Sequence, residues 1–245
     1  EEIPDFLKNK VKIRIIKFNS KWKNILEEFN NNFYNRSNWC KSDLNFARFF
    51  IFEVFPEIDR VVYLDWDMIV QDDIYNLIDE YNMKCSVVCN LFNKWTVKDN
   101  IINDKVKIKK SIYEIFNEEL NNDNFLIKNS FNSGFYILSR EKFNLEILNK
   151  LIIKLINIQK EYNLFKFGTQ VIMNILLQDN HFINYTWNTN HILGSSKIIH
   201  WCGHKKPWDS NDTIWYSYFN ELYFTENKDL DIKKKINRNL LVRLI

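Results

Sequence analysis

The amino-acid sequence predicts an α/β fold, and two observations carry this prediction. Short apolar runs of strand type alternate along the chain with segments whose apolar residues recur at helical spacing. This order is typical of a mostly parallel sheet with helices on its faces. The chain has 245 residues, 46% of them hydrophobic and 16% aromatic, which is enough apolar mass for a packed core. We find no internal repeat or flexible linker, so we expect one compact domain over residues 1–227, with two halves that meet near residue 125.

The strands and helices are expected in alternating order. In the first half, continuous or β-branched apolar runs predict strands at 10–18, 60–65 and 85–90. Helical spacing predicts helices from Ser20 to about 33, from Ser42 to the stop at Pro56, and around 74–81. The polar stretch at 92–110 shows no period and is predicted to be a surface loop or lid. In the second half, we expect helices at 111–120, 142–162 and 169–178, and strands at 131–138, 182–185 and 197–201.

Composition excludes several classes of protein. The aromatic content argues against a disordered chain, and four Cys are too few for a disulfide scaffold. No run approaches eighteen apolar residues, and a net charge of +3 is too small for nucleic acid to be the main partner. The chain begins at Glu1 without a Met or a visible signal peptide, so a processed or truncated fragment is expected. The unpaired-looking cysteines fit a reducing compartment at least as well as an oxidising one. The compartment therefore stays open, with a cytoplasmic or peripheral-membrane location slightly favoured.

The last segment, 228–245, is expected to be a basic amphipathic helix or tail. It carries six basic and two acidic residues beside a partly helical stripe of Leu and Ile. Such a helix can lie on a membrane surface as a peripheral contact. It can equally pack on its own domain or continue into a further one.

The sharpest local signal is a pair of carboxylates directly after a buried strand. Asp65 and Asp67 follow the apolar run of residues 60–64, and side chains two apart in an extended segment point the same way. Ligands of open α/β sheets bind at the carboxyl ends of strands, and two convergent carboxylates suit Mg²⁺ or Mn²⁺. Alternatively, Asp65 caps the next turn and Asp67 is merely solvated.

A second signal is the sequence Phe131-Asn132-Ser133-Gly134-Phe135. The chain has only four Gly, so Gly134 in an aromatic strand suggests close approach of a ligand or of another backbone segment. Asn132 offers a donor and an acceptor to a hydroxyl-rich ligand. A simple bulge at Gly134 explains the pattern equally well.

A third signal follows the last predicted strand, from His200 to Trp208. His200 is a candidate metal ligand, Gly203 would let the backbone approach a phosphate, and Lys206 would place a compact charge on it. A zinc site using His200, Cys202 and His204 is the competing interpretation. It lacks a second pair of ligands in the sequence to complete a structural tetrahedron.

In register, these segments resemble glycosyltransferase family 8, whose members are retaining enzymes with the nucleotide-sugar-binding α/β fold called GT-A, a Rossmann-like mixed sheet flanked by helices. The resemblance runs from about Lys10 to Phe219. It rests on motifs that occur in the family's order: Ala47-Arg48, Phe55-Pro56, Val62 to Asp67, Phe131 to Gly134, Gln170, and His200 to Trp208. It implies a hexosyltransferase of carbohydrate biosynthesis that moves a hexose-type sugar from a UDP-sugar, most readily UDP-glucose or UDP-galactose. The acceptor would be a hydroxyl of a glycan, a protein or a lipid-linked sugar.

The resemblance also implies roles for individual residues. Asp65, Asp67 and His200 would hold Mn²⁺ (or Mg²⁺), and Gly203 and Lys206 would contact the diphosphate. Arg48, Asn90 and Asn132 would lie around the donor sugar, and Gln170 would stand beside the anomeric carbon. Gln170 and Asn132 are thus the candidate catalytic residues.

The chain departs from the family pattern at several positions. Trp66 stands where a small residue is usual between the aspartates, Thr169 replaces a common Asp, and Asn90 replaces an Asp that contacts the sugar. No counterpart of the family's first strand and helix, which build the uracil pocket, is found before Lys10.

Two other functions remain open on the sequence alone. A haloacid-dehalogenase-like phosphohydrolase also carries two aspartates after a buried strand, but it needs a later acidic pair that the sequence does not offer. A catalytically degenerate module that binds nucleotide sugars or glycans would retain the same motifs.

Overall fold

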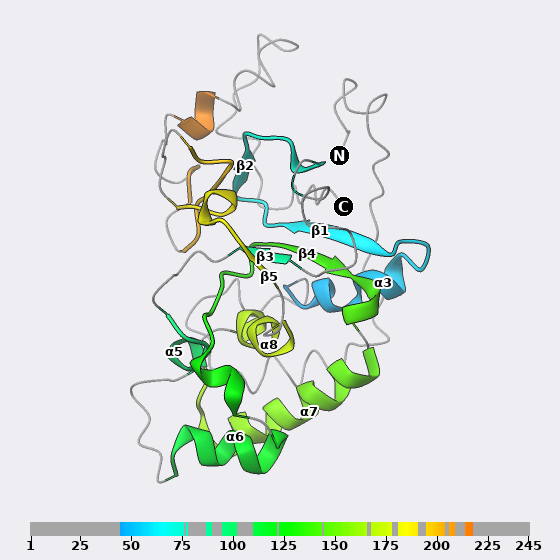
Figure 1. The fold of residues 1–245 in the computed structure, drawn as a ribbon, viewed down its shortest axis with the longest axis vertical. Helices are drawn as coiled ribbons and strands as arrows, with labels where there is room; N and C mark the ends of the chain where they lie inside the picture. The colour runs from blue at the N-terminus through cyan, green and yellow to red at the C-terminus, as the bar shows by residue number, and fades with distance from the viewer. Residues whose placement is uncertain are drawn as a thin grey trace.

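The computed structural model describes residues 45–75, 77, 87–89, 95–101, 110–121, 123–143, 145–165, 168–177, 181–190, 195–203, 206–208 and 214–217. A four-stranded sheet crosses the middle of this part of the chain, with helices α6, α7 and α8 on one side and strand β2 on the other (Figure 1). The strand expected at 10–18, the helix expected from Ser20, and the tail at 228–245 lie outside the described residues.

The larger sheet has the strand order β1-β4-β3-β5. Its strands are β1 (Arg60–Leu64), β4 (Phe135–Ser139), β3 (Val87–Cys89) and β5 (His181–Ile183). A separate two-stranded sheet pairs β2 (Met68–Val70) with β6 (Ile198–His200).

The helices fall into α-helices and short 3-10 helices. The α-helices are α3 (Ile51–Val54), α5 (Val97–Ile101), α6 (Ile112–Leu120), α7 (Leu145–Tyr162) and α8 (Gly168–Leu176). The 3-10 helices are η4 (Ala47–Phe50), η5 (Asn124–Ile127), η6 (Arg140–Lys142) and η7 (Tyr185–Trp187). Among the described helices, none is both long enough and apolar enough to cross a membrane.

Strand directions differ from the expected mostly parallel sheet. β4 lies between β1 and β3 and is antiparallel to both, whereas β3 and β5 are parallel. The α/β fold class and the mixed sheet are therefore confirmed, but the mostly parallel arrangement is wrong for the described pairs. The reversal has a local consequence, because an antiparallel β4 begins where β1 ends. The backbone N–H of Asp65 donates to the carbonyl of Gly134 at 2.8 Å.

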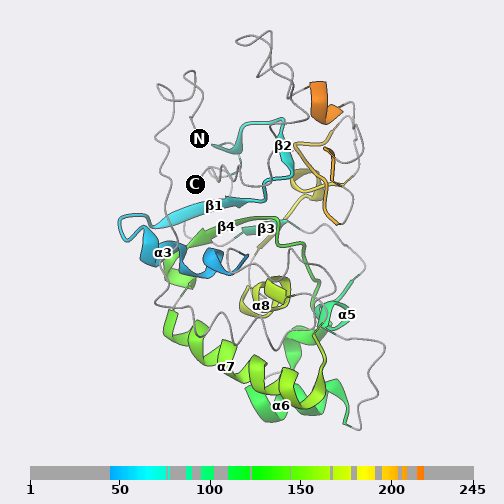
Figure 2. The same ribbon diagram turned by 180° about the vertical axis from the view of Figure 1, so that it is seen from behind.

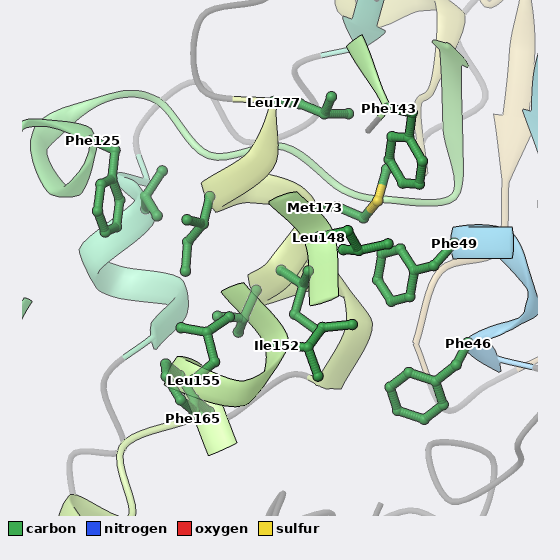
Figure 3. Packing of buried hydrophobic residues seen from close by; sticks show 14 of the residues in the cluster. Phe46, Phe49, Phe125, Phe143, Leu148, Ile152, Leu155, Phe165, Met173 and Leu177 are labelled. Atoms are coloured by element: carbon green, nitrogen blue, oxygen red, sulfur yellow. The ribbon is translucent and has the colours of Figure 1, made fainter. Parts of the chain in front are cut away.

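Alternate residues of the sheet face two different apolar clusters. Tyr136 and Leu138 of β4 belong to the large core, while Phe135 and Ile137 belong to a smaller cluster on the opposite face. This alternation is the period-2 pattern of a strand that is covered on both faces. In Figure 3, the large core joins Phe46 and Phe49 to side chains of α7 and to Met173 of α8. Figure 2 shows from behind that α7 and α8 lie on the same side of the sheet.

The element boundaries show where the sequence pattern was incomplete. Helix α5 lies inside the stretch predicted as a loop or lid at 92–110, where Thr96 and Asp99 hydrogen-bond each other at its first turn. Strand β2 was not predicted. β4 begins at Phe135 rather than 131 because the Asn132 side chain accepts the N–H of Gly134 at 2.9 Å, which makes a turn there. The single helix predicted from Ser42 to Pro56 appears in the described residues as the 3-10 helix η4 followed by the short helix α3. The strands predicted at 60–65 and 197–201 are found, slightly shortened.

Candidate functional site

The two carboxylates and the imidazole predicted to hold a metal lie together. One ligand atom from each of Asp65, Asp67 and His200 can be chosen so that all three lie within 4.8 Å of one another. Nε2 of His200 is 3.5 Å from Oδ1 of Asp67 and 3.9 Å from Oδ2 of Asp65. The side chains of Asp67 and His200 are each 2% exposed, whereas that of Asp65 is 28% exposed. Asp65 is thus the member of the group that is open to a ligand.

Backbone pairing on both sides brings these three side chains together. Met68 of β2 is paired with His200 of β6, and the N–H of Trp201 donates to the carbonyl of Asp67 at 3.0 Å. Asp65 is fixed from the other side, through its bond to Gly134 at the start of β4. The segment from Asp65 to Asp67 therefore links the edge of the large sheet to the small sheet.

Gly134 makes room for this arrangement. A Cβ atom at position 134 would lie 2.3 Å from Cε1 of His200 and 2.9 Å from both Oδ2 of Asp65 and Oδ1 of Asn132. All three are side-chain atoms of the candidate site, so at least one of these side chains would have to move to admit the Cβ. The close approach inferred from the sequence is thus an approach of other protein groups to Gly134, and the simple bulge is not required to explain it.

Arg48 is buried beneath Asp65. Its guanidinium donates to the carbonyl of Ser133 at 2.9 Å and to the carbonyl and side chain of Asn45 at 3.0 Å, and it lies 3.5 Å from Oδ1 of Asp65. The hydroxyl of Tyr63 donates to the same Asp65 oxygen at 2.8 Å. Burial opposes the charge on Arg48, but the nearby oxygens of Tyr63, Tyr136 and Asp65 outweigh it and raise the pKa of Arg48. Arg48 therefore stays cationic and holds Asp65 and the turn before β4 in place.

Lys206 reaches the same centre from the segment after β6. Its ammonium donates to Oδ2 of Asp67 and to the carbonyl of Trp201. Burial alone would raise the pKa of Asp67, but the hydrogen bond with His200 and the charges of His200 and Lys206 lower it overall. Asp67 is therefore held as a carboxylate, the form that can bind a cation.

Gln170 and Asn174 join the site to helix α8. Oε1 of Gln170 accepts the N–H of Ser133 at 3.3 Å. The Asn174 amide, one turn further along, accepts the N–H of Phe131 at 2.9 Å and donates to its carbonyl at 3.0 Å. An amide that makes both bonds to one residue imitates a neighbouring strand, and it fixes the segment 131–134 against the helix.

Two buried amides in the site were not found from the sequence. Asn174 is 1% exposed and Asn188 is fully buried, and both bind groups of the candidate site. Asn174 lies among apolar residues of the helix predicted at 169–178, and Asn188 lies in a mixed stretch without a period. The sequence Thr186-Trp187-Asn188-Thr189, just before the strand that carries His200, is the only local signal that could have pointed to Asn188.

The remaining sequence-predicted residues have mixed outcomes. Gly203 lies in the described part with φ at +107°, a conformation that favours glycine, and no atom comes within 4 Å of an added Cβ. Asn132 lies in the site, whereas Asn90 falls outside the described residues. His204 is also outside them, and Cys202 is not in the group of potential metal ligands, so the described residues give the zinc interpretation no support. The pKa of the Cys202 thiol is raised, first by burial and then by Asp67.

Comparison with known proteins decides the family. A model of glycosyl transferase family 8 matches residues 1–212. The chain belongs to glycosyl transferase family 8. The match begins at the first residue. The stretch before Lys10, where the sequence offered no counterpart of the family's first strand and helix, lies outside the described residues.

Curated relatives in this family are distant in sequence. A probable galacturonosyltransferase-like protein 4 of Arabidopsis thaliana is 23% identical over 221 residues, which cover 77% of this chain and 57% of that protein. The human glycosyltransferase 8 domain-containing protein 2 is 27% identical over 206 residues, covering 72% of this chain and 58% of the relative. The chain thus spans somewhat more than half the length of these relatives.

Solved structures with the same fold include the galactosyltransferase LgtC in complex with donor and acceptor sugar analogues. That structure matches with a TM-score of 0.56 and 18% identity over 85% of this chain and 76% of LgtC. A second LgtC structure, described as an active-site mutant in which Gln is replaced by Glu, matches with a TM-score of 0.55. The family-8 chain therefore has the GT-A fold of these enzymes.

Proposed function

We propose that this family-8 chain is a metal-dependent retaining glycosyltransferase. It moves a hexose-type sugar from a UDP-sugar, with UDP-glucose or UDP-galactose the favoured donors, to a hydroxyl acceptor. The observation that carries the proposal is the grouping of Asp65, Asp67 and His200 within 4.8 Å at the end of β1, with the ammonium of Lys206 bound to one of them. The fold shared with LgtC, whose structure holds donor and acceptor sugar analogues, supports the same substrate class.

The donor set fits a divalent cation. Two carboxylates and one imidazole suit Mn²⁺, and Mg²⁺ would use the carboxylates with water completing its shell. When bound, such a cation supplies positive charge to the diphosphate of the donor. Asp67 and His200 are too buried to be reached from most directions, so the half-buried Asp65 faces the side from which the nucleotide would enter.

The protein's own groups would divide the remaining work. Lys206 would move its ammonium from Asp67 to a phosphate oxygen, and Gly203 would bring a backbone N–H to the same group. Arg48 and Asn132, together with Asn90, would orient the sugar either directly or through Asp65 and the turn before β4. Gln170 would lie near the reacting carbon, in keeping with the Gln that was exchanged in the LgtC active-site mutant.

The transfer itself can then proceed on one face of the sugar. The acceptor hydroxyl forms a bond to the anomeric carbon on the face from which the diphosphate departs. The bond from that carbon to the phosphate oxygen breaks, and the hydroxyl proton passes to the departing phosphate oxygen. Gln170 carries an amide rather than a carboxylate, so it cannot form a covalent glycosyl ester, and this favours direct attack over a two-step route.

Calorimetry of UDP in the presence and absence of Mn²⁺ tests the metal assignment. We expect Asp65→Ala and Asp67→Ala to abolish Mn²⁺-dependent UDP binding. Asp72→Ala, which removes an exposed carboxylate paired with Lys197 at 3.0 Å, should leave it unchanged. Wild-type UDP affinity in both site variants would refute the metal assignment.

Turnover of a panel of UDP-sugars tests the activity. Release of UDP with an α-configured donor and a product of the same configuration, seen by proton NMR, would support a retaining transferase. Binding without turnover or hydrolysis across the panel would instead identify a module that only binds nucleotide sugars. Turnover of p-nitrophenyl phosphate, inhibited by none of the UDP-sugars, would restore the phosphohydrolase interpretation.

A further inference from the structure

The buried amide of Asn188 is 0% exposed and lies between two parts of the candidate site. Its Oδ1 is 2.9 Å from Nδ1 of His200, and its Nδ2 is 3.5 Å from the carbonyl oxygen and 3.4 Å from Oδ1 of Asn132. An amide has one accepting and one donating end, so its orientation decides which proton arrangement its neighbours must adopt.

The orientation can be traced from a group whose polarity is certain. The backbone N–H of Gly134 can only donate, and it donates to the Asn132 side chain at 2.9 Å. The Asn132 atom that faces Gly134 is therefore the oxygen. This side-chain oxygen and the carbonyl of Asn132 are two acceptors, and both face the same end of the Asn188 amide. That end must be the NH₂ group.

The same reasoning continues to His200. With its NH₂ group directed at Asn132, Asn188 presents its oxygen to Nδ1 of His200. Only a protonated Nδ1 can make a hydrogen bond with an oxygen. The opposite orientation would set an oxygen against two other oxygens, with no proton between them, which is costly in a buried site.

We propose that Asn188 is a positioning residue that holds a proton on Nδ1 of His200, so that Nε2, which faces Asp65 and Asp67, is the ring nitrogen left to bind a cation. The inference rests on the proposed function, in which His200 is a metal ligand. A ligand histidine whose other nitrogen donates to a fixed acceptor has its ring orientation and its tautomer set in advance. The chain of bonds thus runs from the backbone N–H of Gly134 through two asparagines to the Nε2 atom.

The space around His200 agrees with this role. Cε1, the ring atom between the two nitrogens, would lie only 2.3 Å from a Cβ atom at position 134, so the ring packs directly against Gly134. The ring is 2% exposed and sits at the end of β6, whose residue pairing with β2 fixes its backbone. A half-turn of the ring, which exchanges Nδ1 with Cδ2 and Nε2 with Cε1, would lose the bond to Asn188. The amide therefore selects both the protonated nitrogen and the ring orientation.

Nitrogen-15 NMR of the metal-free protein tests the inference without reference to activity. Long-range proton–nitrogen spectra report the protonation of each ring nitrogen separately, and the His200 signals are identified by their loss in His200→Gln. In the wild type we expect a protonated Nδ1, whether or not Nε2 also carries a proton. A neutral His200 ring with its proton on Nε2 would overturn the proposal.

Variants of Asn188 separate tautomer control from packing. Asn188→Leu removes the acceptor and should allow the Nε2-protonated form, with a loss of Mn²⁺ affinity of about 10- to 100-fold by electron paramagnetic resonance. Asn188→Asp keeps an oxygen against Nδ1 and should keep Nδ1 protonated, but its second oxygen then faces the two oxygens of Asn132, so its stability should fall. The matched control is Gln159→Leu, which removes another buried amide, one that accepts from Phe165 and donates to Asn163, on α7. It should lower stability but leave the His200 spectrum and Mn²⁺ affinity unchanged.

The outcomes distinguish this inference from the proposed function. A wild-type protein with the Nδ1-protonated ring but no affinity for Mn²⁺ would contradict the metal site and support the role of Asn188. Mn²⁺ binding by a protein whose metal-free ring is protonated on Nε2 and not on Nδ1 would support the metal site and refute the role of Asn188. If Asn188→Leu does not fold, the wild-type spectrum and Asn188→Asp still decide the question.

Discussion

Trp66 stacks on Trp208, with ring centroids 4.0 Å apart and an angle of 25° between the planes. The residue between the two aspartates thus packs against the residue two positions after Lys206. This stack and the ion pair of Asp67 with Lys206 are two parallel links between the same two segments. Trp215 extends the aromatic contact, since its ring lies edge-on to Trp208 at 5.6 Å and to Trp201 at 5.3 Å.

Loss of this stack should weaken nucleotide binding without removing a ligand. Trp66→Ala frees the segment that carries Lys206, and an aromatic pair contributes about 0.5–1.5 kcal/mol beyond its buried area. We expect UDP affinity in the presence of Mn²⁺ to fall about 2- to 12-fold in calorimetry. Trp95→Ala provides the control, because Trp95 is similarly exposed, at 44% against 47% for Trp66. An unchanged affinity in Trp66→Ala would mean that the stack does not position Lys206.

Replacement by Ala should remove metal binding at Gly134 but only lower thermal stability at Gly203. At Gly134 the new Cβ would meet the ring of His200 at 2.3 Å, so Mn²⁺ binding should be lost. At Gly203 nothing lies within 4 Å, but the φ of +107° strains a non-glycine residue by about 1–2 kcal/mol. Gly203→Ala should therefore lower Tm by roughly 2–8 °C and keep Mn²⁺ affinity. Thermal unfolding and Mn²⁺ titration of both variants check the contrast, and equal losses of metal affinity would contradict it.

Arg48→Lys should be far from conservative. The planar guanidinium serves Asn45, Ser133 and Asp65 at the same time, and a single ammonium cannot reach all of them. We expect a loss of about 1–3 kcal/mol of stability in urea unfolding and a fall of Mn²⁺ affinity on the order of tenfold. Arg60→Lys, at the opposite end of β1 from Asp65, is the control and should change neither quantity measurably. Wild-type metal affinity in Arg48→Lys would show that Asp65 does not depend on the guanidinium.

Asn174→Leu should destabilise the whole domain. The substitution leaves the N–H and the carbonyl of Phe131 without their amide partner in a buried place. Each such group costs about 1–3 kcal/mol, so the free energy of unfolding should fall by roughly 2–6 kcal/mol. Urea unfolding measures the loss. Asn149→Leu, at a half-buried position of α7, is the comparison and should lower the free energy of unfolding clearly less. A loss below about 1 kcal/mol for Asn174→Leu would contradict a stabilising role for the two hydrogen bonds between Asn174 and Phe131.

The sequence predicted most elements because their patterns are local. The apolar run that ends at Asp65, the helical spacing after Ser111, and the long amphipathic helix that ends at Tyr162 were all found close to their predicted bounds. Strand direction was not predictable in this way, because a run of apolar residues looks the same whichever way its neighbours point. Strand β2 was missed because three residues are too few to show a period.

In the candidate site too, the residues with a local sequence signal were predicted and those without one were missed. Asp65, Asp67 and His200 were predicted because each follows or ends a strand, where ligands bind in this class of fold. Asn174 and Asn188 were not, because a buried asparagine is recognised only by the partners that satisfy it, and these lie 43 and 12 residues away in the sequence.

The three candidate ligands are divided between two sheets. Asp65 follows the edge strand of the four-stranded sheet, whereas His200 is the last residue of β6 in the two-stranded one. The distance between these ligands is therefore set by how the two sheets meet, and not by either sheet alone. Phe135 and Trp187 pack against each other in the smaller apolar cluster. Substitutions there would change the distance between the candidate ligands, and with it the proposed metal affinity, without replacing any ligand.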